Sequence, residues 1–226
     1  MKASNILLTA ILSFIFLASI GSNLILKSEY DKIDRNDQLS GYTRQALKPF
    51  KYVKLQGKSV GMTAIQQGDS YQLRMIVDKK YLGWKYVGDT LEVTFKRDWN
   101  GGNYGPDQLI QMTPSIYIIA PKISGVISEE NNYYLRNWIS SDISVRQNGG
   151  YLLLSDNSIN NLTTQINSGG YFKIDRRNKI GKADIKLADS SALHIEKNVF
   201  ESFHTTFDST AVIDLPGSLI KKALVD

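Results

Sequence analysis

The stretch QNGGYLLL, residues 147–154, places two glycines directly before a run of large apolar residues. The same arrangement recurs three times downstream, as NSGGYFKI at 167–174, ADSSALHI at 188–195 and FDSTAVID at 207–214. Glycine, asparagine, aspartate and serine favour the backbone conformations of sharp turns, so we interpret each small-residue step as the corner of a repeating unit. The corner positions lie 20, 21 and 19 residues apart: Gly149, Gly169, Ser190 and Ser209.

Apolar side chains follow these corners at the same period. The first column expected to point inward contains Leu152, Phe172, Leu193 and Val212. The next contains Leu154, Ile174 and Ile195 and is broken by Asp214. Two columns later in each unit contain Ile159, Ile180, Phe200 and Leu219, and then Leu162, Ala183, Phe203 and Ala223. A period near 20 with such columns predicts a β-solenoid, in which successive rungs pair in parallel around a shared core.

The chain upstream of the corners also has strand-type composition. Two stretches, GDSYQLRM at 68–75 and GDTLEVTF at 88–95, repeat at 20 residues, with apolar residues in alternation. The region 96–137 is irregular and contains the turn-rich insert RDWNGGNYGPDQ. The fold class we predict is therefore all-β, with a single β-solenoid domain over residues 49–226 and rungs of about 20 residues.

The first 26 residues form a membrane-directed segment. Residues 6–26 carry no charge, and only Thr, Ser, Asn and Gly interrupt the apolar run. Two alternatives stay open: a signal peptide cleaved near Ser19-Ile20-Gly21, or an uncleaved anchor long enough to span a bilayer of about 30 Å. The return of apolar residues at Leu24 favours the anchor. Both alternatives place the chain from residue 27 onward outside the cytoplasm.

Residues 27–48 contain many charges of both signs and few apolar residues. This composition predicts a polar stalk or linker between the membrane-directed segment and the β-solenoid.

Composition and charge exclude several classes of function. Lys and Arg total 27 against 22 acidic residues, but the excess is spread along the chain, whereas nucleic-acid binding requires clustered cations with interleaved aromatic residues. The chain has no cysteine, which excludes disulfides, thiolate metal sites and cysteine nucleophiles. The two histidines, His194 and His204, lack the spacing of a metal site or a catalytic triad. We expect no cofactor, no metal and no nucleic-acid partner.

Several of these features together resemble one bacterial family, called "putative auto-transporter adhesin, head GIN domain". The resemblance covers residues 30–219 and lies in the membrane-directed segment, EYDK at 29–32, FKYVKLQG at 50–57, the GDSYQLRM and GDTLEVTF pair and the small-residue corners. It implies a β-solenoid directed to the cell envelope, in a family whose biochemical role is not established and which has no catalytic residues to carry over. The corners Ser190-Ser191 and Ser209-Thr210 depart from the glycines that the family tends to have.

Few residues qualify as a functional site. The Gly149-Gly150 and Gly169-Gly170 steps are followed by strands, whereas a phosphate-binding loop precedes a helix, so we interpret both as corners. The strongest charge cluster is Asp175-Arg176-Arg177 with Lys179. One period away, Asp175 aligns with Ser155 and Glu196, and Arg177 aligns with Asn157 and Asn198. Trp99 and Tyr104 lie in the turn-rich insert, where aromatic rings can stack on sugars or anchor a partner.

Two hypotheses about function follow from these observations. The favoured one is a non-enzymatic protein of the bacterial cell envelope, tethered to the membrane or exported, that presents a surface to a protein or glycan partner or has a structural role. The alternative is a carbohydrate-active enzyme or glycan-binding module that uses the outer strands. The residues we expect to contact such a partner are Trp99, Tyr104, Asp175, Arg176, Arg177 and Glu196.

Overall fold

The computed structural model describes residues 3–35, 37–58, 61–96, 105, 108–109 and 111–223, apart from the side chains of 221–223. The insert residues Trp99 and Tyr104 lie outside this part of the chain. The chain divides into two units, one up to Thr43 and one from Arg44 onward. The finer division at residues 26 and 48 stays a prediction.

The first unit contains one long helix, α1 (Ala3–Asp31), which includes the whole apolar segment and continues into the polar residues that follow it. None of its residues is buried. Its polar side chains bond within the helix: Thr9 Oγ1 donates to the carbonyl of Asn5, and Ser19 Oγ to the carbonyl of Ile15. By length and composition α1 could cross a membrane, a test that an N-terminal signal sequence also passes.

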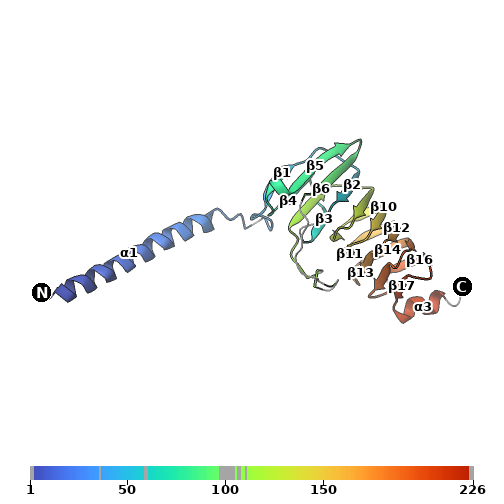
Figure 1. Ribbon diagram of the computed structural model, residues 1–226. Coiled ribbons are helices and arrows are strands. Elements are labelled where there is room, and N and C mark those ends of the chain that lie inside the picture. The colour runs from blue at the N-terminus through green and yellow to red at the C-terminus, as the bar shows by residue number, and fades with distance from the viewer. Residues whose placement is uncertain are drawn as a thin grey trace. The chain divides into compact units, whose positions relative to one another are not determined.

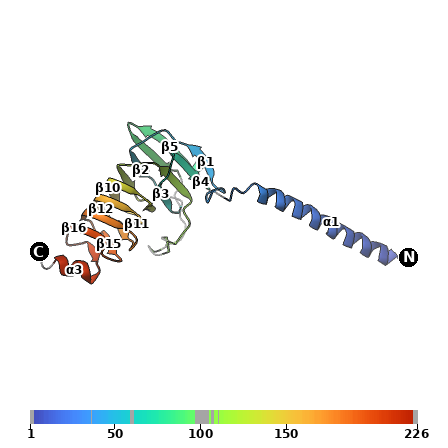
Figure 2. The same ribbon diagram turned by 180° about the vertical axis from the view of Figure 1, so that it is seen from behind.

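The second unit is a β-solenoid built from two sheets (Figures 1 and 2). In each of its rungs from β8 onward, a strand of one sheet is followed by a strand of the other. The nine-stranded sheet contains, in spatial order, β1 (Thr43–Ala46), β4 (Gln72–Met75), β7 (Ile116–Ala120), β3 (Thr63–Gln67), β9 (Tyr133–Arg136), β11 (Tyr151–Ser155), β13 (Tyr171–Ile174), β15 (Ala192–Ile195) and β17 (Val212–Asp214).

The eight-stranded sheet contains, in spatial order, β16 (Phe200–Phe207), β14 (Lys179–Leu187), β12 (Ser158–Asn167), β10 (Ile139–Asn148), β8 (Gly125–Glu129), β2 (Tyr52–Gln56), β6 (Thr90–Phe95) and β5 (Leu82–Val87). A short 3₁₀-helix, η1 (Lys79–Tyr81), precedes β5, and helix α3 (Gly217–Ala223) ends the described chain. The predicted all-β solenoid is confirmed.

The rungs from β8 to β17 follow the sequence order, and we call them the regular rungs. Their strands pair in parallel, and the predicted columns are confirmed: Leu152 pairs with Phe172 and Phe172 with Leu193, while Ile159 pairs with Ile180 and Ile180 with Phe200. Most of these side chains are buried almost completely, so the core runs continuously through the regular rungs.

The last rung departs from the predicted columns. Leu193 pairs with Ile213, whereas Val212 pairs with Ala192 and is 62% exposed, so the prediction that Val212 points inward was wrong by one residue. Because strand side chains alternate between faces, such a slip moves a side chain to the opposite face. Leu219, expected in a fourth strand, lies in helix α3, where it is buried against the end of the core.

The rungs from β2 to β7 do not follow the sequence order, and we call them the interleaved rungs. Strand β2 lies between β6 and β8, and β3 lies between β7 and β9, so the first rung of the chain is enclosed by two later ones. The predicted repeat of 68–75 with 88–95 does not stack, because β4 and β6 belong to different sheets. β4 pairs antiparallel with β7, and β5 pairs antiparallel with β6.

The glycine step at 149–150 is a corner, as predicted. Both residues have positive φ, 66° and 71°, which only glycine adopts without strain. A Cβ at Gly150 would overlap the carbonyl oxygen of Asn131 in the neighbouring rung. Later corners adopt the same conformation with other small residues, since Ser168, Asp189 and Ser190 also have positive φ. The two glycines therefore turn the chain where the rungs are closest.

Candidate functional site

The eight-stranded sheet bends near the start of its longer strands, and this bend creates a narrow third face of the solenoid. In β12 the neighbouring residues Asn160 and Asn161 are both exposed, between the buried Ile159 and Leu162. The register with β14 leaves out Asn160 and Gly181, one residue in each strand, so the two strands bend together and their pairing continues in step. At this shared bend two successive asparagines face solvent.

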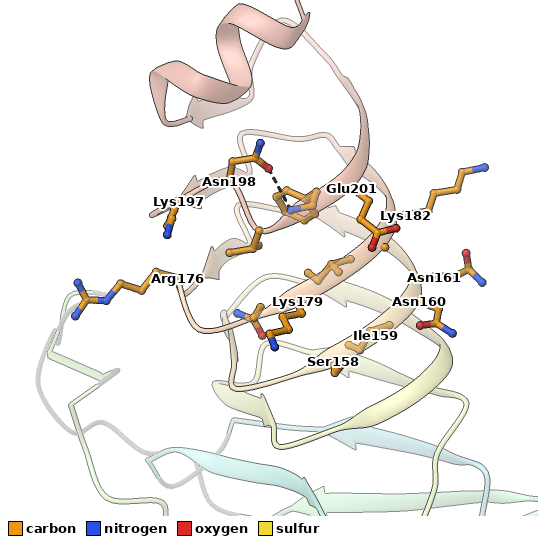
Figure 3. A pocket seen from close by; sticks show the side chains of 15 residues that line it. Ser158, Ile159, Asn160, Asn161, Arg176, Lys179, Lys182, Lys197, Asn198 and Glu201 are labelled. Atoms are coloured by element: carbon orange, nitrogen blue, oxygen red, sulfur yellow. Dashed lines mark hydrogen bonds between the residues drawn. The ribbon is translucent and has the colours of Figure 1, made fainter.

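A groove of about 690 Å³ lies on this third face, and we call it the third-face groove (Figure 3). It crosses three successive rungs, from β12 through β14 to β16. In Figure 3, Arg176, Lys179 and Lys197 lie on one side, and Lys182 and Glu201 lie on the other. Its lining residues are 158–161, Arg176, 178–182 and 197–201.

Gly181 accounts for part of this hollow, because it contributes no side chain to the middle of the groove. A Cβ at this position would lie 2.6 Å from the carbonyl oxygen of Asn160, so the close approach of the two strands at their shared bend requires glycine. The apolar residues Ile159 and Ile180 belong to the core and are almost completely buried. The exposed lining is therefore polar.

A buried asparagine ladder supports the groove from below. The Nδ2 of Asn157 donates to the Oδ1 of Asn178 over 2.9 Å, and the Nδ2 of Asn178 donates to the carbonyl of Leu154 over 2.8 Å. The Oδ1 of Asn157 accepts from the backbone N–H of Trp138. Such hydrogen bonds satisfy backbone groups at the corner where no strand ladder reaches them. The asparagines thus fix the loops that carry Arg176 and Lys197.

The third-face groove is cationic. Arg176, Lys179, Lys182 and Lys197 line it together with one carboxylate, that of Glu201, so the charge of the lining is 4 − 1 = +3. All four cations are exposed. In the part of the chain that the structure describes, none of the four forms an ion pair. The groove therefore presents uncompensated positive charge to the solvent.

The predicted cluster around Asp175 lies beside this groove, on the outer face of the nine-stranded sheet. As predicted, Asp175 and Glu196 occupy the same position on neighbouring rungs, because Ile174 pairs with Ile195. Arg177 holds Asp175 with its Nη2 3.0 Å from Oδ2, and Lys173 holds Glu196 with its Nζ 3.2 Å from Oε1. Both carboxylates thus have cationic partners.

The ionisation of Asp175 follows from these contacts. Burial tends to raise the pKa of its carboxyl, but the hydrogen bonds from the Arg177 side chain and backbone outweigh burial and hold the pKa below its usual value. The hydrogen bond to Asp175 in turn raises the pKa of Arg177. A general acid needs a raised pKa, so Asp175 has the electrostatics of an ion-pair partner.

The alignment predicted for Arg177 was wrong. The sequence placed it in one column with Asn157 and Asn198, but Asn178 is the residue that occupies the ladder beside Asn157. Arg177 instead lies one position earlier and bonds Asp156, with Nη2 3.1 Å from Oδ2. The loop between the sheets has one residue more in this rung than a fixed spacing of 20 assumes.

The two histidines lie where the sequence placed them, outside the core. His194 is on the outer face, with its Nδ1 2.6 Å from the Oδ2 of Asp214, and His204 is exposed on β16. Within the described residues, no group of three or more His, Cys, Asp or Glu side chains is arranged to hold a metal ion.

The sequence identified Arg176 and Lys179 but missed the other groove cations, Lys182 and Lys197. A signal for both was present, since they fall in the two loop-to-strand segments that follow Asp175 and Glu196. What hid them is the shared bend at Asn160 and Gly181. A strict alternation of faces fails across this bend, so the third face does not show in the pattern.

Comparisons with known proteins do not identify a family for this chain. No family model and no curated protein matches the chain, so membership of the head GIN domain family stays a prediction. Among solved structures, the chain is similar to a "putative adhesin" from Bacteroides fragilis, with 12% identity, a TM-score of 0.38 and coverage of 77% of this chain and 96% of that one.

Two further solved structures are similar to the same extent. A "putative lipid binding protein" from Parabacteroides distasonis has 12% identity and a TM-score of 0.45, with coverage of 76% of this chain and 80% of that one. A "putative cell adhesion protein" from Clostridium sporogenes has 10% identity and a TM-score of 0.26, with coverage of 76% and 97%. At these identities and scores, the likeness says nothing about what this chain binds.

Proposed function

We propose that this protein is a non-enzymatic binding module of the bacterial cell envelope, held at a membrane by α1 and presenting its β-solenoid outside the cytoplasm. The observation that carries the proposal is α1 itself, a helix of 29 residues of which none is buried in the protein. Its uncharged, mostly apolar part, residues 6–26, is about 30 Å long at 1.5 Å per residue, which matches the thickness of a bilayer, and its exposure is unfavourable in water. The solenoid is the part available for a partner.

The continuity of α1 supports an anchor over a cleaved signal. The helix runs without a break through Ser19, Ile20 and Gly21, where cleavage would occur, and ends at Asp31. The hydroxyl groups of Thr9 and Ser19 donate to helix carbonyls, which satisfies them without water, as a bilayer requires. The anchored form therefore retains residues 1–26.

Two observations support a binding role over catalysis. The aligned carboxylates Asp175 and Glu196 are engaged by Arg177 and Lys173, and the lowered pKa of Asp175 opposes proton donation near neutral pH. The third-face groove includes neither carboxylate. Acid and base catalysis on a sugar needs such groups beside the bound substrate, so the enzyme alternative lacks support at this groove.

Localisation of the full chain tests the proposal. After fractionation of the native host, we expect the intact chain beginning at Met1 in the membrane fraction, with the solenoid degraded by protease added to spheroplasts. A control variant, Ile15→Lys, places a charge in the middle of α1 and should reduce membrane recovery, whereas Ile15→Ala should not.

Two results would overturn the proposal. One is a soluble protein that begins near Ser22, which would show cleavage of the leader. The other is a solenoid protected from protease in spheroplasts. The positive-inside rule favours this second orientation, because Lys27, Lys32 and Arg35 follow the apolar segment whereas only Lys2 precedes it. The protease measurement is therefore the decisive one.

A further inference from the structure

We infer that the third-face groove binds an acidic polysaccharide, with the polymer lying along the solenoid axis and its carboxylates against the groove cations. This inference rests on the proposed function, because the solenoid meets such polymers only outside the cytoplasm. It adds Lys182 and Lys197 to Arg176 and Lys179, which belong to the charge cluster identified from the sequence.

The first argument is the contrast between the groove and the neighbouring outer faces. On the nine-stranded sheet Lys173 and Arg177 are paired with carboxylates, and on the eight-stranded sheet Lys54 lies within 4.0 Å of Glu92. The four groove cations have no such partner among the described residues. Cations that line a groove of charge +3 without an ion-pair partner attract anions more strongly than paired ones.

The second argument is the repeat of these cations along the solenoid. Arg176 and Lys197 lie at the same position on successive rungs, because Ile174 pairs with Ile195. Neighbouring parallel strands are about 4.8 Å apart, so the two charges recur at the spacing of the rungs. Lys179 and Lys182 belong to the strand between β12 and β16. A polymer with regularly spaced anionic groups fits cations that repeat in this way along the solenoid axis.

The third argument is the supply of amide groups beside the cations. The Oδ1 of Asn198 accepts from the backbone N–H of Phe200, which leaves its Nδ2 as a donor. The Nδ2 of Asn161 donates to Asp142, which leaves its Oδ1 as an acceptor. The amide of Asn160 is exposed as well. Donors and acceptors of this kind suit the hydroxyl groups of a sugar.

The lining fits other polyanions less well. None of the exposed large apolar residues of the described chain lines the groove, whereas insertion into a lipid surface requires such residues. Binding of single-stranded nucleic acid requires exposed aromatic rings for base stacking, but the aromatic residue in the lining, Phe200, is only 8% exposed. A polar, cationic groove with free amides favours an acidic sugar polymer.

The experiment measures binding of the full chain, in micelles of a neutral detergent, to an oligogalacturonate of defined length. The methyl ester of the same oligogalacturonate is the uncharged control ligand. The test variant is Lys179→Glu with Lys197→Glu, and the control is Lys122→Glu with Lys186→Glu. The control lysines are also exposed and lie outside the groove lining, so both double variants change the net charge equally. Circular dichroism verifies that each variant is folded.

We expect the oligogalacturonate to bind and its methyl ester to fail. The groove variant should lose about tenfold or more in affinity, since two attractions of up to about fivefold each are reversed, while the control should lose less than threefold. Added salt should weaken binding, because exposed charges are screened. Glu201→Gln should strengthen it, because the variant removes the one carboxylate of the lining.

Four outcomes would overturn the inference: no binding of the oligogalacturonate at millimolar concentration, equal binding of the methyl ester, equal loss in both double variants, or binding of anionic lipid vesicles that depends on Lys179 and Lys197 without binding of the sugar. The protease and fractionation measurements test the proposed function independently, since they use no ligand. If the sugar does not bind but the solenoid is membrane-bound and outside the cytoplasm, the acidic polysaccharide is rejected as the ligand and the proposed location stands.

Discussion

The regular and the interleaved rungs connect similar strands in different orders. From β8 to β17, each new rung stacks on the one made just before it, and every pairing is parallel. From β2 to β7, the first rung is enclosed by later ones, and β4 and β5 are attached antiparallel at the outer side. Strands with similar apolar alternation can thus be connected along the chain in two different orders.

The comparison teaches that buried polar side chains distinguish the two regions more than apolar alternation or corner conformation does. Corners of positive φ occur in both regions, as at Gly149 and Gly57, whereas the ladder of Asn157 and Asn178 lies in the regular rungs. The two regions are joined by longer-range bonds, in which the Nε1 of Trp138 donates to the carbonyl of Ile65 over 3.1 Å and the backbone of Ile139 donates to Gln67. Substitutions can test each of these differences between the two regions.

The largest effect is expected at the tightest corner. Gly150→Ala adds a Cβ that overlaps the carbonyl of Asn131 at a positive φ, so we expect a loss of roughly 4 kcal/mol or more in the free energy of unfolding. The matched control is Gly169→Ala, which has the same φ of 71° but no atom within 4 Å, and should lose only about 1–2 kcal/mol. Urea denaturation measures both; equal losses would contradict the steric argument.

The next effect concerns the asparagine ladder. Asn178→Ala leaves the buried backbone N–H of Asn157 without its acceptor, and it removes one of the two donors to the carbonyl of Leu154, which keeps the N–H of Asp175. The variant should destabilise the protein by about 3 kcal/mol. Asn198, one rung later, is only half-buried and bonds the backbone of Phe200, so Asn198→Ala should lose about 1 kcal/mol. If thermal unfolding ranks the two variants in the opposite order, the ladder does not stabilise the regular rungs.

A smaller effect is expected where the two regions meet. Trp138→Phe removes the hydrogen bond to the carbonyl of Ile65 from a side chain that is 1% exposed, and should lose about 2 kcal/mol. The control Trp84→Phe lies in the interleaved rungs at a half-buried position and should lose less than about 1 kcal/mol. Hydrogen exchange should show faster opening of β3 in the first variant, and unchanged exchange there would argue against Trp138 as a connector.

The smallest effect is the pH-dependent one. The pKa of Asp175 in the folded protein lies below its ordinary value of 3.8, so its contribution is present above about pH 4 and is lost as the pH falls through the folded value. Arg177 is 59% exposed, which screens the pair, and Asp175→Asn should therefore lose only about 0.5 kcal/mol at pH 7. The difference from the unmodified protein should shrink below pH 4; a constant difference would exclude the ion pair as its cause.

The regular rungs could be predicted from the sequence because each position repeats. Leu152, Phe172 and Leu193 form one column in the sequence and one column in the structure. The interleaved rungs could not be predicted, since the alternation in 68–75 indicates which face is buried but contains no information on the pairing partner. The slip at Val212 has a related cause: the residue that corresponds to Ser190 is Thr210, 20 residues later, and not Ser209, because Leu187 pairs with Phe207 and Ala192 with Val212.

The site was predictable in part. Asp175 and Glu196 align as expected, and their neighbour Arg176 lines the groove. The remaining groove residues depend on the shared bend at Asn160 and Gly181, which exposes two neighbouring positions on β12. A two-residue alternation assigns one of these positions to the core, so only the backbone geometry brings Lys182 and Lys197 into the same groove as Arg176 and Lys179.

The interleaving of β2 and β3 also determines how the protein can be made. Translation produces this rung first, yet both of its edges stay unpaired until the ribosome has added β6 to β9, some of which follow only after the insert. Open strand edges invite pairing with other chains, so the nascent protein is most exposed to aggregation during this interval. From β10 onward each rung docks on a finished one as it emerges. Chaperones would therefore be needed early in synthesis and not late.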